Sequence, residues 1–432
     1  MEVLTLSNEL ERADKGFAGV LRAMMMTNTQ RVNLMNRSVV EYKPSEVDAF
    51  FDPARGVYNA LISGGDPRLR NSAIVAQAIC SSLNGFPVVV LHEGNYLLEQ
   101  QLRSTFSSSG KYKEISVNAP CFEPFYGLNE LEISNQILET APKEYDIKYN
   151  AKYYIDGISA YLKANGRNRS FKLFSTCPHS MIFDKVDDLE IQGKISDHEA
   201  QAIKSKLMMG QSENYKLESY FSSFKMEIEP LMYVSKKGYR PLNIIAALKS
   251  NSILCFDLAS ITNKILLNTI IFQLKLALTK GLRYQIVIDS IPIESNDLYS
   301  SYIRAPSDKV CKTISADDFY AMVGGDEKVF SAVVGNMQTL IIMNHSSGHS
   351  ATKWAEIFGQ YDKYEESYST SRGESRRTPF SLMGSPNYNR TVNISKNREY
   401  IVKPEMISRM GSGEAFVLSA ALGQLAHLIL TS

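Results

Sequence analysis

The chain has 432 residues, of which 44% are hydrophobic and 22% are charged, and its formal net charge is +1. This length predicts two or three domains, or one domain with a large insertion. The near-neutral charge provides no overall basic field for nucleic acid, although it does not exclude a local basic patch. The five cysteines are dispersed without a CxxC pair, which is typical of reduced thiols in a cytosolic protein. No stretch approaches the roughly 20 apolar residues of a membrane-spanning helix, so no membrane span is predicted.

The first part of the chain predicts a strand–helix–strand unit. Residues 1–45 are assigned to an N-terminal helical segment. Residues 57–63 predict a strand, residues 72–83 place apolar side chains at helical spacing, and residues 86–95 predict a fully apolar strand. A glycine-containing turn joins the first strand to the helix. This βαβ order predicts a parallel sheet with a right-handed crossover.

The pattern changes between residues 125 and 250, where strand signals nearly vanish. Two capping boxes mark helix starts in this region: Asn129 with Glu132, and Ser196 with Glu199. We therefore predict an inserted all-helical domain over residues 125–250. Residues 46–124 and 251–432 then form one α/β domain around it.

Strand patterns return after residue 250. The predicted elements follow the order strand 252–260, helix 261–280, strand 282–292, strand 338–346 and helix 350–359. Residues 362–390 are polar and rich in Ser, Arg and Tyr, which predicts an exposed hairpin or a loose loop. The predicted fold class is α/β, with a mostly parallel sheet.

The turn GGDPRLRNS after the first strand partly fits the phosphate-binding pattern GxxxxGK[ST]. Gly65 and Ser72 match the pattern, whereas Arg70 replaces its second glycine and Asn71 replaces its lysine. Asp66 would place negative charge beside a phosphate. An arginine can bind phosphate in place of the lysine, and an ordinary strand-to-helix turn is the alternative interpretation. The candidate nucleotide-binding residues are Gly64, Gly65, Arg68, Arg70, Asn71 and Ser72.

The strand IVIDS ends in Asp289, as a Walker B strand does. An Asp at this place faces a Mg²⁺–phosphate site, so Asp289 and Ser72 are the candidate Mg²⁺ ligands. Ser290 stands where a hydrolysing enzyme usually carries a glutamate, and a hydroxyl with an ordinary pKa is a poor general base. No catalytic residue is therefore assigned. His92 and Glu93 also end a strand, although polar residues commonly cap strands.

Several segments, in this order, resemble the TraG/TraD class of type IV coupling proteins, within the FtsK/HerA-type RecA-like P-loop ATPases. They are YNALISGG, RNSAIVAQAI, VVVLHEGN, YYIDGISAYLKAN and YQIVIDS, and the match covers most of residues 45–420. The resemblance implies a RecA-like P-loop NTPase fold with an inserted all-alpha domain. It also implies a hexameric ring that uses ATP and Mg²⁺ to move DNA or to deliver substrates to a secretion channel.

The chain departs from this family at the positions that carry the chemistry. The P-loop lysine is Asn71, the second glycine is Arg70, the Walker B glutamate is Ser290, and the sensor glutamine falls at or near Ala316. We interpret the chain as a coupling-protein-like component of a conjugative DNA transfer or type IV secretion system. It would be a pseudo-ATPase that acts in assembly or substrate recruitment.

The implied partners are DNA or a DNA–protein transfer substrate, other type IV secretion components, and a hexamer or hetero-oligomer with an active homologue. The implied location is cytoplasmic, peripheral to the inner face of the membrane. One alternative is an active ATP-dependent DNA motor with a non-standard P-loop, which predicts Mg-ATP binding that is lost in Asp289→Ala. Another is a nucleotide-independent DNA-binding protein with a basic channel formed by Arg68, Arg70, Arg372, Arg376 and Arg377.

Overall fold

The computed structural model describes residues 45–46, 56–167, 169–177, 179–233, 241–259, 265–293, 298–375, 385–419 and 424–430. The predicted N-terminal helical segment lies outside these residues, except that Ser45 belongs to the short strand β1 (Ser45–Glu46). The chain divides into two compact units. The larger unit contains Val47–Met343, and the smaller contains Asn344–Phe416 and Leu425–Ile429. This division does not separate residues 125–250 from the rest of the larger unit, so the boundaries of an inserted domain stay a prediction.

The larger unit is built on a parallel sheet, as the βαβ pattern predicts. Its strands, in the order of the sheet, are β8 (Thr339–Ile342), β2 (Ala60–Ser63), β7 (Val310–Ala316), β6 (Tyr284–Asp289), β3 (Val88–His92), β5 (Ile253–Asp257) and β4 (Tyr112–Ile115). All residues of β2, β3, β5, β6 and β8 are buried. Such uninterrupted burial is typical of parallel strands that are covered on both faces.

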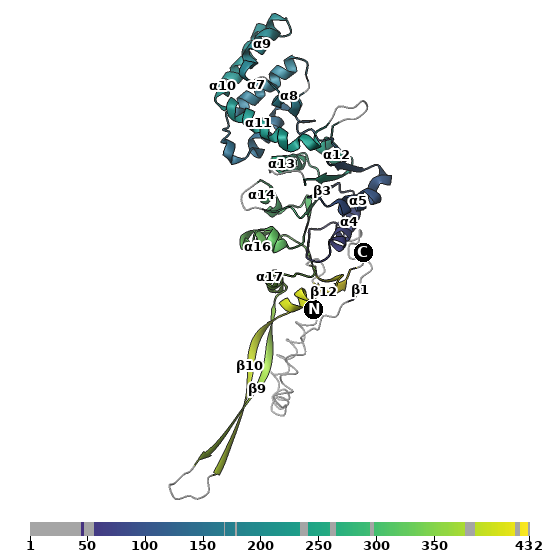
Figure 1. The fold of residues 1–432 in the computed structure, drawn as a ribbon, viewed down its shortest axis with the longest axis vertical. Helices are drawn as coiled ribbons and strands as arrows, with labels where there is room; N and C mark the ends of the chain where they lie inside the picture. The colour runs from purple at the N-terminus through teal and green to yellow at the C-terminus, as the bar shows by residue number, and fades with distance from the viewer. Residues whose placement is uncertain are drawn as a thin grey trace. The chain divides into compact units, whose positions relative to one another are not determined.

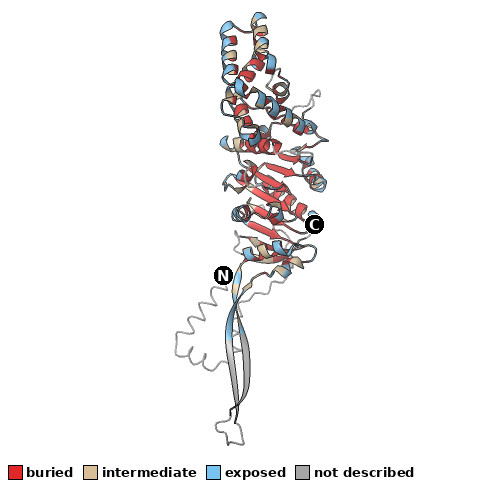
Figure 2. Ribbon diagram, turned by 60° about the vertical axis from the view of Figure 1, so that its left-hand side comes forward, coloured by how far each residue is buried: buried red, intermediate tan, exposed pale blue. Residues whose placement is uncertain are grey.

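Helices cover both faces of this sheet. They are α4 (Pro67–Leu83), α5 (Tyr96–Phe106), α13 (Ile265–Thr279), α14 (Leu298–Arg304), α15 (Phe319–Met322) and α16 (Glu327–Val334). Figure 1 shows α4 and α5 on one side of the strands and α13, α14 and α16 on the other. The buried strands run through the middle of this unit between helices that expose their outer faces (Figure 2). The parallel sheet and its crossover helices confirm the predicted α/β class.

The region between β4 and β5 is helical, which we call the helical region. It contains α6 (Glu130–Thr140), α7 (Ala151–Ala164), α8 (Phe171–Ser175), α9 (Ile182–Ile191), α10 (Asp197–Met209), α11 (Asn214–Ile228) and α12 (Ile244–Lys249). Its short 3-10 turns are η4 (Lys143–Tyr145), η5 (His179–Met181), η6 (Gln211–Glu213) and η7 (Glu229–Leu231), whereas η3 (Ser107–Ser109) precedes β4. Both predicted capping boxes are present, at the starts of α6 and α10.

An aromatic cluster forms the core of the helical region. Its fully or nearly fully buried rings are Phe125, Tyr154, Phe171, Phe174, Tyr220, Phe221 and Phe224. His179 lies within this cluster, with its ring stacked near Tyr154 and Phe221 at centroid distances of 5.8 and 6.2 Å. The Tyr154 hydroxyl lies 3.2 Å from His179 Nδ1. Burial lowers the pKa of His179, and the nearby carboxylate of Glu218 opposes this effect more weakly.

The buried imidazole predicts that acid destabilises the helical region. The folded state favours neutral His179, whereas the unfolded chain takes up the proton below about pH 6.5. The free energy of unfolding should therefore decrease as the pH falls past about 6.5, by at most about 1.4 kcal/mol per pH unit for this group. In His179→Phe this decrease should become shallower. Urea unfolding followed by circular dichroism at several pH values measures it, and an equal pH dependence in both proteins would contradict it.

The smaller unit contains α17 (Gly348–Phe358), β9 (Gln360–Ser375), β10 (Ser385–Tyr400), α18 (Pro404–Ser408) and β12 (Gln424–Ile429) except for Gln424. The strand β11 (Glu414–Ser419) is divided between the two units after Phe416. β9 and β10 pair in antiparallel register as a long hairpin, so the predicted polar segment is a hairpin rather than a loose loop. Trp354 is fully buried and donates to His345 Nε2 at 3.2 Å. In the part of the chain that the structure describes, no helix is long and apolar enough to span a membrane.

Candidate functional site

Polar side chains gather where the parallel strands of the larger unit reach their carboxyl ends. His92, at the end of β3, is in register with Asp257 of β5 on one side and with Asp289 of β6 on the other. Ser63 of β2 is in register with Ala316 of β7. His92, Asp257 and Asp289 are all buried. Ligands of open α/β sheets bind at this edge, which makes it the candidate site.

Helix α4 starts at Pro67, five residues earlier than the sequence predicts, and so occupies most of the expected phosphate loop. Asp66 is the N-cap, and its carboxylate accepts a hydrogen bond from the N–H of Arg68 at 2.8 Å. Its carbonyl oxygen accepts from the N–H groups of Leu69 and Arg70 at 3.1 and 3.2 Å. Pro67 has no N–H to offer. The first-turn amides, which would otherwise form an anion site, are therefore used by Asp66.

The two glycines of the loop have structural reasons of their own. Gly64 and Gly65 adopt φ values of 89° and 70°, in the left-handed region that favours glycine. The N–H of Gly64 donates to the carbonyl oxygen of Ala316 at 3.1 Å. A Cβ atom at Gly65 would lie 2.7 Å from side-chain atoms of Met343. The tight turn and this close approach require glycine without any phosphate.

Arg70 is held by the protein rather than offered to a ligand. Its side chain is only 5% exposed, and Nη1 donates to the carbonyl oxygens of Gly64 at 3.1 Å and Gly65 at 2.9 Å. Nη2 forms an ion pair with Asp317, which follows β7. Arg68, in contrast, is exposed on the first turn of α4. Of the two arginines predicted to replace the P-loop lysine, only Arg68 remains accessible.

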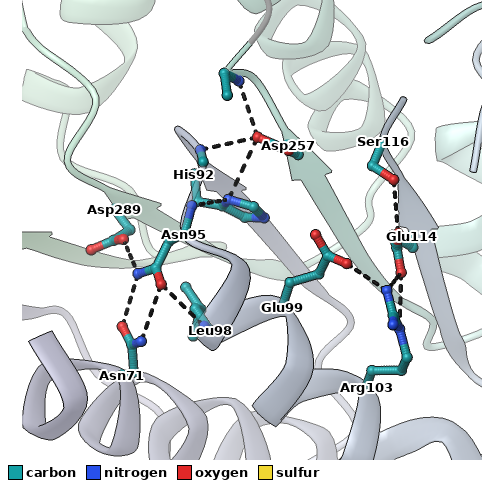
Figure 3. Close-up of polar contacts among 12 residues, drawn as sticks. Asn71, His92, Asn95, Leu98, Glu99, Arg103, Glu114, Ser116, Asp257 and Asp289 are labelled. Atoms are coloured by element: carbon teal, nitrogen blue, oxygen red, sulfur yellow. Dashed lines mark hydrogen bonds and ion pairs between the residues drawn. The ribbon is translucent and has the colours of Figure 1, made fainter. Parts of the chain in front are cut away.

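Asn71, at the position of the P-loop lysine, belongs to an amide network instead (Figure 3). It is 1% exposed and bonds to Asn95, whose Nδ2 donates to Asn71 Oδ1 at 2.9 Å. Asn95 Nδ2 also donates to Asp289 Oδ2 at 2.7 Å. The Walker B-like carboxylate thus receives a neutral amide where an active site would hold Mg²⁺. Asn71 and its partner Asn95 are both neutral, so burying Asn71 places no additional charge in the interior.

The two serines of the predicted site are also engaged locally. Ser72 Oγ donates to the carbonyl oxygen of Arg68 at 3.0 Å, one turn earlier in the same helix. Ser290 follows Asp289 with φ at 59°, and its N–H donates to the carbonyl oxygen of Ser315 at 2.8 Å. Among the residues that the structure describes, neither hydroxyl is paired with a base that would activate it as a nucleophile.

The basic channel of the DNA-binding alternative loses members in the structure. Arg70 is buried within the loop, so it cannot line a channel. Arg376 and Arg377 lie outside the described residues. Arg372 lies in β9, in the smaller unit, whereas Arg68 belongs to the larger unit. A basic channel that joins Arg68 with Arg372 therefore stays a prediction.

Three residues that the sequence does not single out hold the site together. Asn95 bridges α4 and β6, and Asp317 holds Arg70. Asp257 Oδ1 accepts from the N–H groups of Gly94 and Ala259, both at 3.0 Å. Of these three, Asp257 carries a signal in the sequence, because it ends the strand ILCFD. The start of α4 carries one as well, because Asp66 followed by Pro67 is a typical helix N-terminus.

A second polar group lies beside this row, between α5 and β4 (Figure 3). Arg103 Nη2 contacts Glu99 at 2.5 Å, and its Nε donates to Glu114 Oε2 at 3.0 Å. Glu114 also accepts from Ser116 Oγ at 2.7 Å. Burial, together with the neighbouring carboxylate of Glu114, raises the pKa of Glu99 to about 7. Arg103 thus pairs with both carboxylates, so Glu99 and Glu114 have a cationic partner without a metal ion.

The residues present do not fit a nucleoside triphosphate with its magnesium. Such a ligand needs free loop amides, a cation at the lysine position, and a hydroxyl with a carboxylate for the metal. Here Asp66 accepts from the loop amide of Arg68, and Asn95 donates to the carboxylate of Asp289. The hydroxyl of Ser72 donates to the carbonyl oxygen of Arg68. Among the residues that the structure describes, no cluster of three or more His, Cys, Asp or Glu side chains is placed to hold a metal ion.

The fold is similar to that of a solved coupling protein. The unbound form of the bacterial conjugative coupling protein TrwBdeltaN70 matches with a TM-score of 0.50 and 12% identity, covering 93% of this chain and 91% of that chain. The plasmid coupling protein TrwB in complex with ADP and Mg²⁺ matches with a TM-score of 0.50 and 13% identity, covering 94% and 92%. A scan against protein-family models and a search of curated proteins each gave no match. The chain therefore has the RecA-like α/β fold of the TrwB structures, as its sequence resemblance predicts.

Proposed function

We propose that the chain is a coupling-protein-like component of a conjugative DNA transfer or type IV secretion system that acts without hydrolysing ATP. The fold supports the first part, since the structures it resembles are conjugative coupling proteins. The observation that carries the second part is the start of α4 at Pro67. Asp66 uses the first-turn amides, and Arg70 closes over the loop.

The proposed role is assembly or substrate recruitment. A transition state for phosphoryl transfer needs positioned cations and a base, and removal of one such group typically costs a factor of about 100–1000 in rate. The folded sheet and helical region remain well packed although these groups are replaced. A folded sheet and helical region without the groups for ATP hydrolysis can still offer binding surfaces. We expect them to bind DNA or a DNA–protein substrate, other secretion components, or an active homologue in a ring.

A cytoplasmic location at the inner face of the membrane is part of this proposal. All five cysteines are free, and three of them, Cys80, Cys177 and Cys255, are buried in the core. Free thiols are typical of proteins in reducing compartments. Fractionation of the producing cells, with the protein followed by antibody, tests the location.

The proposal predicts that the purified chain neither binds nor turns over Mg-ATP. Calorimetric titration and phosphate release should be measured on one sample, with and without single- and double-stranded DNA. We expect no saturable binding and no turnover above the protein-free background, against roughly 1–1000 per second for typical enzymes. Asp289→Ala is the control for contamination, because it leaves a contaminant's activity unchanged. DNA-stimulated turnover that disappears in Asp289→Ala would support the active-motor alternative and overturn the proposal.

A further inference from the structure

The edge strand β4 leaves part of its backbone unpaired. It is the terminal strand of the sheet and pairs on its inner side with β5. The N–H of Ile253 in β5 donates to the carbonyl oxygen of Lys111 at 2.9 Å, so Lys113 and Ile115 direct their backbone groups toward β5. Tyr112 and Glu114 direct theirs to the opposite side. On that side, among the residues that the structure describes, the Glu114 carbonyl accepts from the weak thiol donor of Cys121 at 3.7 Å.

A groove of about 1060 Å³ runs beside this edge. Lys113 and Glu114 of β4 line it together with Cys121, Tyr126, Leu242 and Ala246. Its walls are the loop that follows β4 and helix α12, and all of them belong to the larger unit. A groove of mainly apolar lining beside an open strand edge is the geometry in which an extended peptide adds to a sheet.

The charges at the groove favour an acidic occupant. Lys111 and Lys113 are exposed, and neither forms an ion pair with any residue that the structure describes. The carboxylate of Glu114 is already matched by Arg103 and Ser116. The net charge that the edge presents to a ligand is therefore positive.

We propose that an extended, acidic segment of a partner protein binds in this groove as an added strand along β4. Main-chain hydrogen bonds to Tyr112 and Glu114 would supply the affinity, and the two lysines would select acidic side chains at alternate positions. The apolar side chains between the acidic ones would point to the opposite face of the sheet, because successive side chains of a strand alternate. This site lies apart from the nucleotide-type edge and does not depend on the function proposed above.

The test uses the full chain and two synthetic peptides of about eight residues, the length of an ordinary strand. One alternates glutamate with valine, and the other alternates lysine with valine. Residue-resolved hydrogen exchange should show that the acidic peptide slows the amides of Tyr112 and Glu114 by roughly tenfold or more. The amides of Lys113 and Ile115, already bonded to β5, should not change. Binding of the acidic peptide without slowed exchange at Tyr112 and Glu114 would overturn the added strand.

Charge reversal tests the selectivity. In Lys111→Glu/Lys113→Glu, both exposed positions, the acidic peptide should bind roughly tenfold more weakly and the lysine peptide should become the preferred ligand. The matched control is Lys172→Glu/Lys194→Glu, which changes the net charge equally at exposed positions of the helical region. It should leave both affinities unchanged. An equal loss in the two variants, or no preference between the peptides in the parent chain, would overturn the proposal.

Discussion

Restoring the lost side chains by Arg70→Gly, Asn71→Lys and Ser290→Glu is expected to lower the free energy of unfolding by about 3–6 kcal/mol and to produce no ATP hydrolysis. The first change removes a buried guanidinium from two carbonyl oxygens and puts glycine inside a helix, which costs about 1 kcal/mol by itself. The second places an ammonium where a 1% exposed amide now bonds to Asn95. The third puts a larger side chain at a left-handed φ of 59°.

The triple variant is expected to lack ATP hydrolysis because the backbone of the loop before α4 is unchanged. Helix α4 would still start at Pro67, with Asp66 bonded to the amides that a phosphate would need. Urea unfolding followed by circular dichroism measures the stability, and phosphate release measures the activity. Asn71→Lys alone is the companion variant, because it leaves the Arg70 contacts and the Ser290 backbone in place. ATP turnover by the triple variant would show that the loop opens readily and that only side chains are missing.

Glu123→Ala is expected to destabilise the helical region by about 2–5 kcal/mol. Glu123 precedes α6 and is 8% exposed. Its Oε1 accepts from the N–H of Phe171 at 2.7 Å and from that of Phe125 at 3.3 Å. Burial raises the pKa of Glu123, and these two N–H donors oppose the rise. Alanine would leave both buried amides without an acceptor, beside the aromatic cluster that Phe125 and Phe171 join.

Glu123→Gln is the matched control for this prediction. Its side-chain carbonyl can accept the same N–H groups without carrying a buried charge, so we expect a change of less than about 1 kcal/mol. Thermal unfolding and hydrogen exchange of the amides of Phe125 and Phe171 measure both variants. Equal destabilisation by alanine and glutamine would show that the negative charge, rather than the acceptor, holds this segment.

The start of α4 depends on a local signal that competes with the P-loop pattern. The P-loop pattern, aligned on Ser72, favours a helix that begins near that residue. Asp66 followed by Pro67 is a typical N-cap and first helical residue, and the helix does begin there. The capping boxes at Asn129 and Ser196 were predicted correctly, because such a box depends only on residues three apart.

Hydrophobic periodicity and helix caps are local properties of the chain, so the residues alone predict most of the parallel strands and the helical region. No pattern in the sequence analysis predicts α5 or the edge strand β4, which lie between residues 96 and 115. The sequence also shows which chemical groups stand at positions 70, 71 and 290. What those groups do instead depends on tertiary contacts. The contacts of Asn95 with Asp289 and of Arg70 with Asp317 join residues far apart in sequence. They exist because β3 lies beside β6 and β2 beside β7, a neighbourhood that depends on how the whole sheet packs.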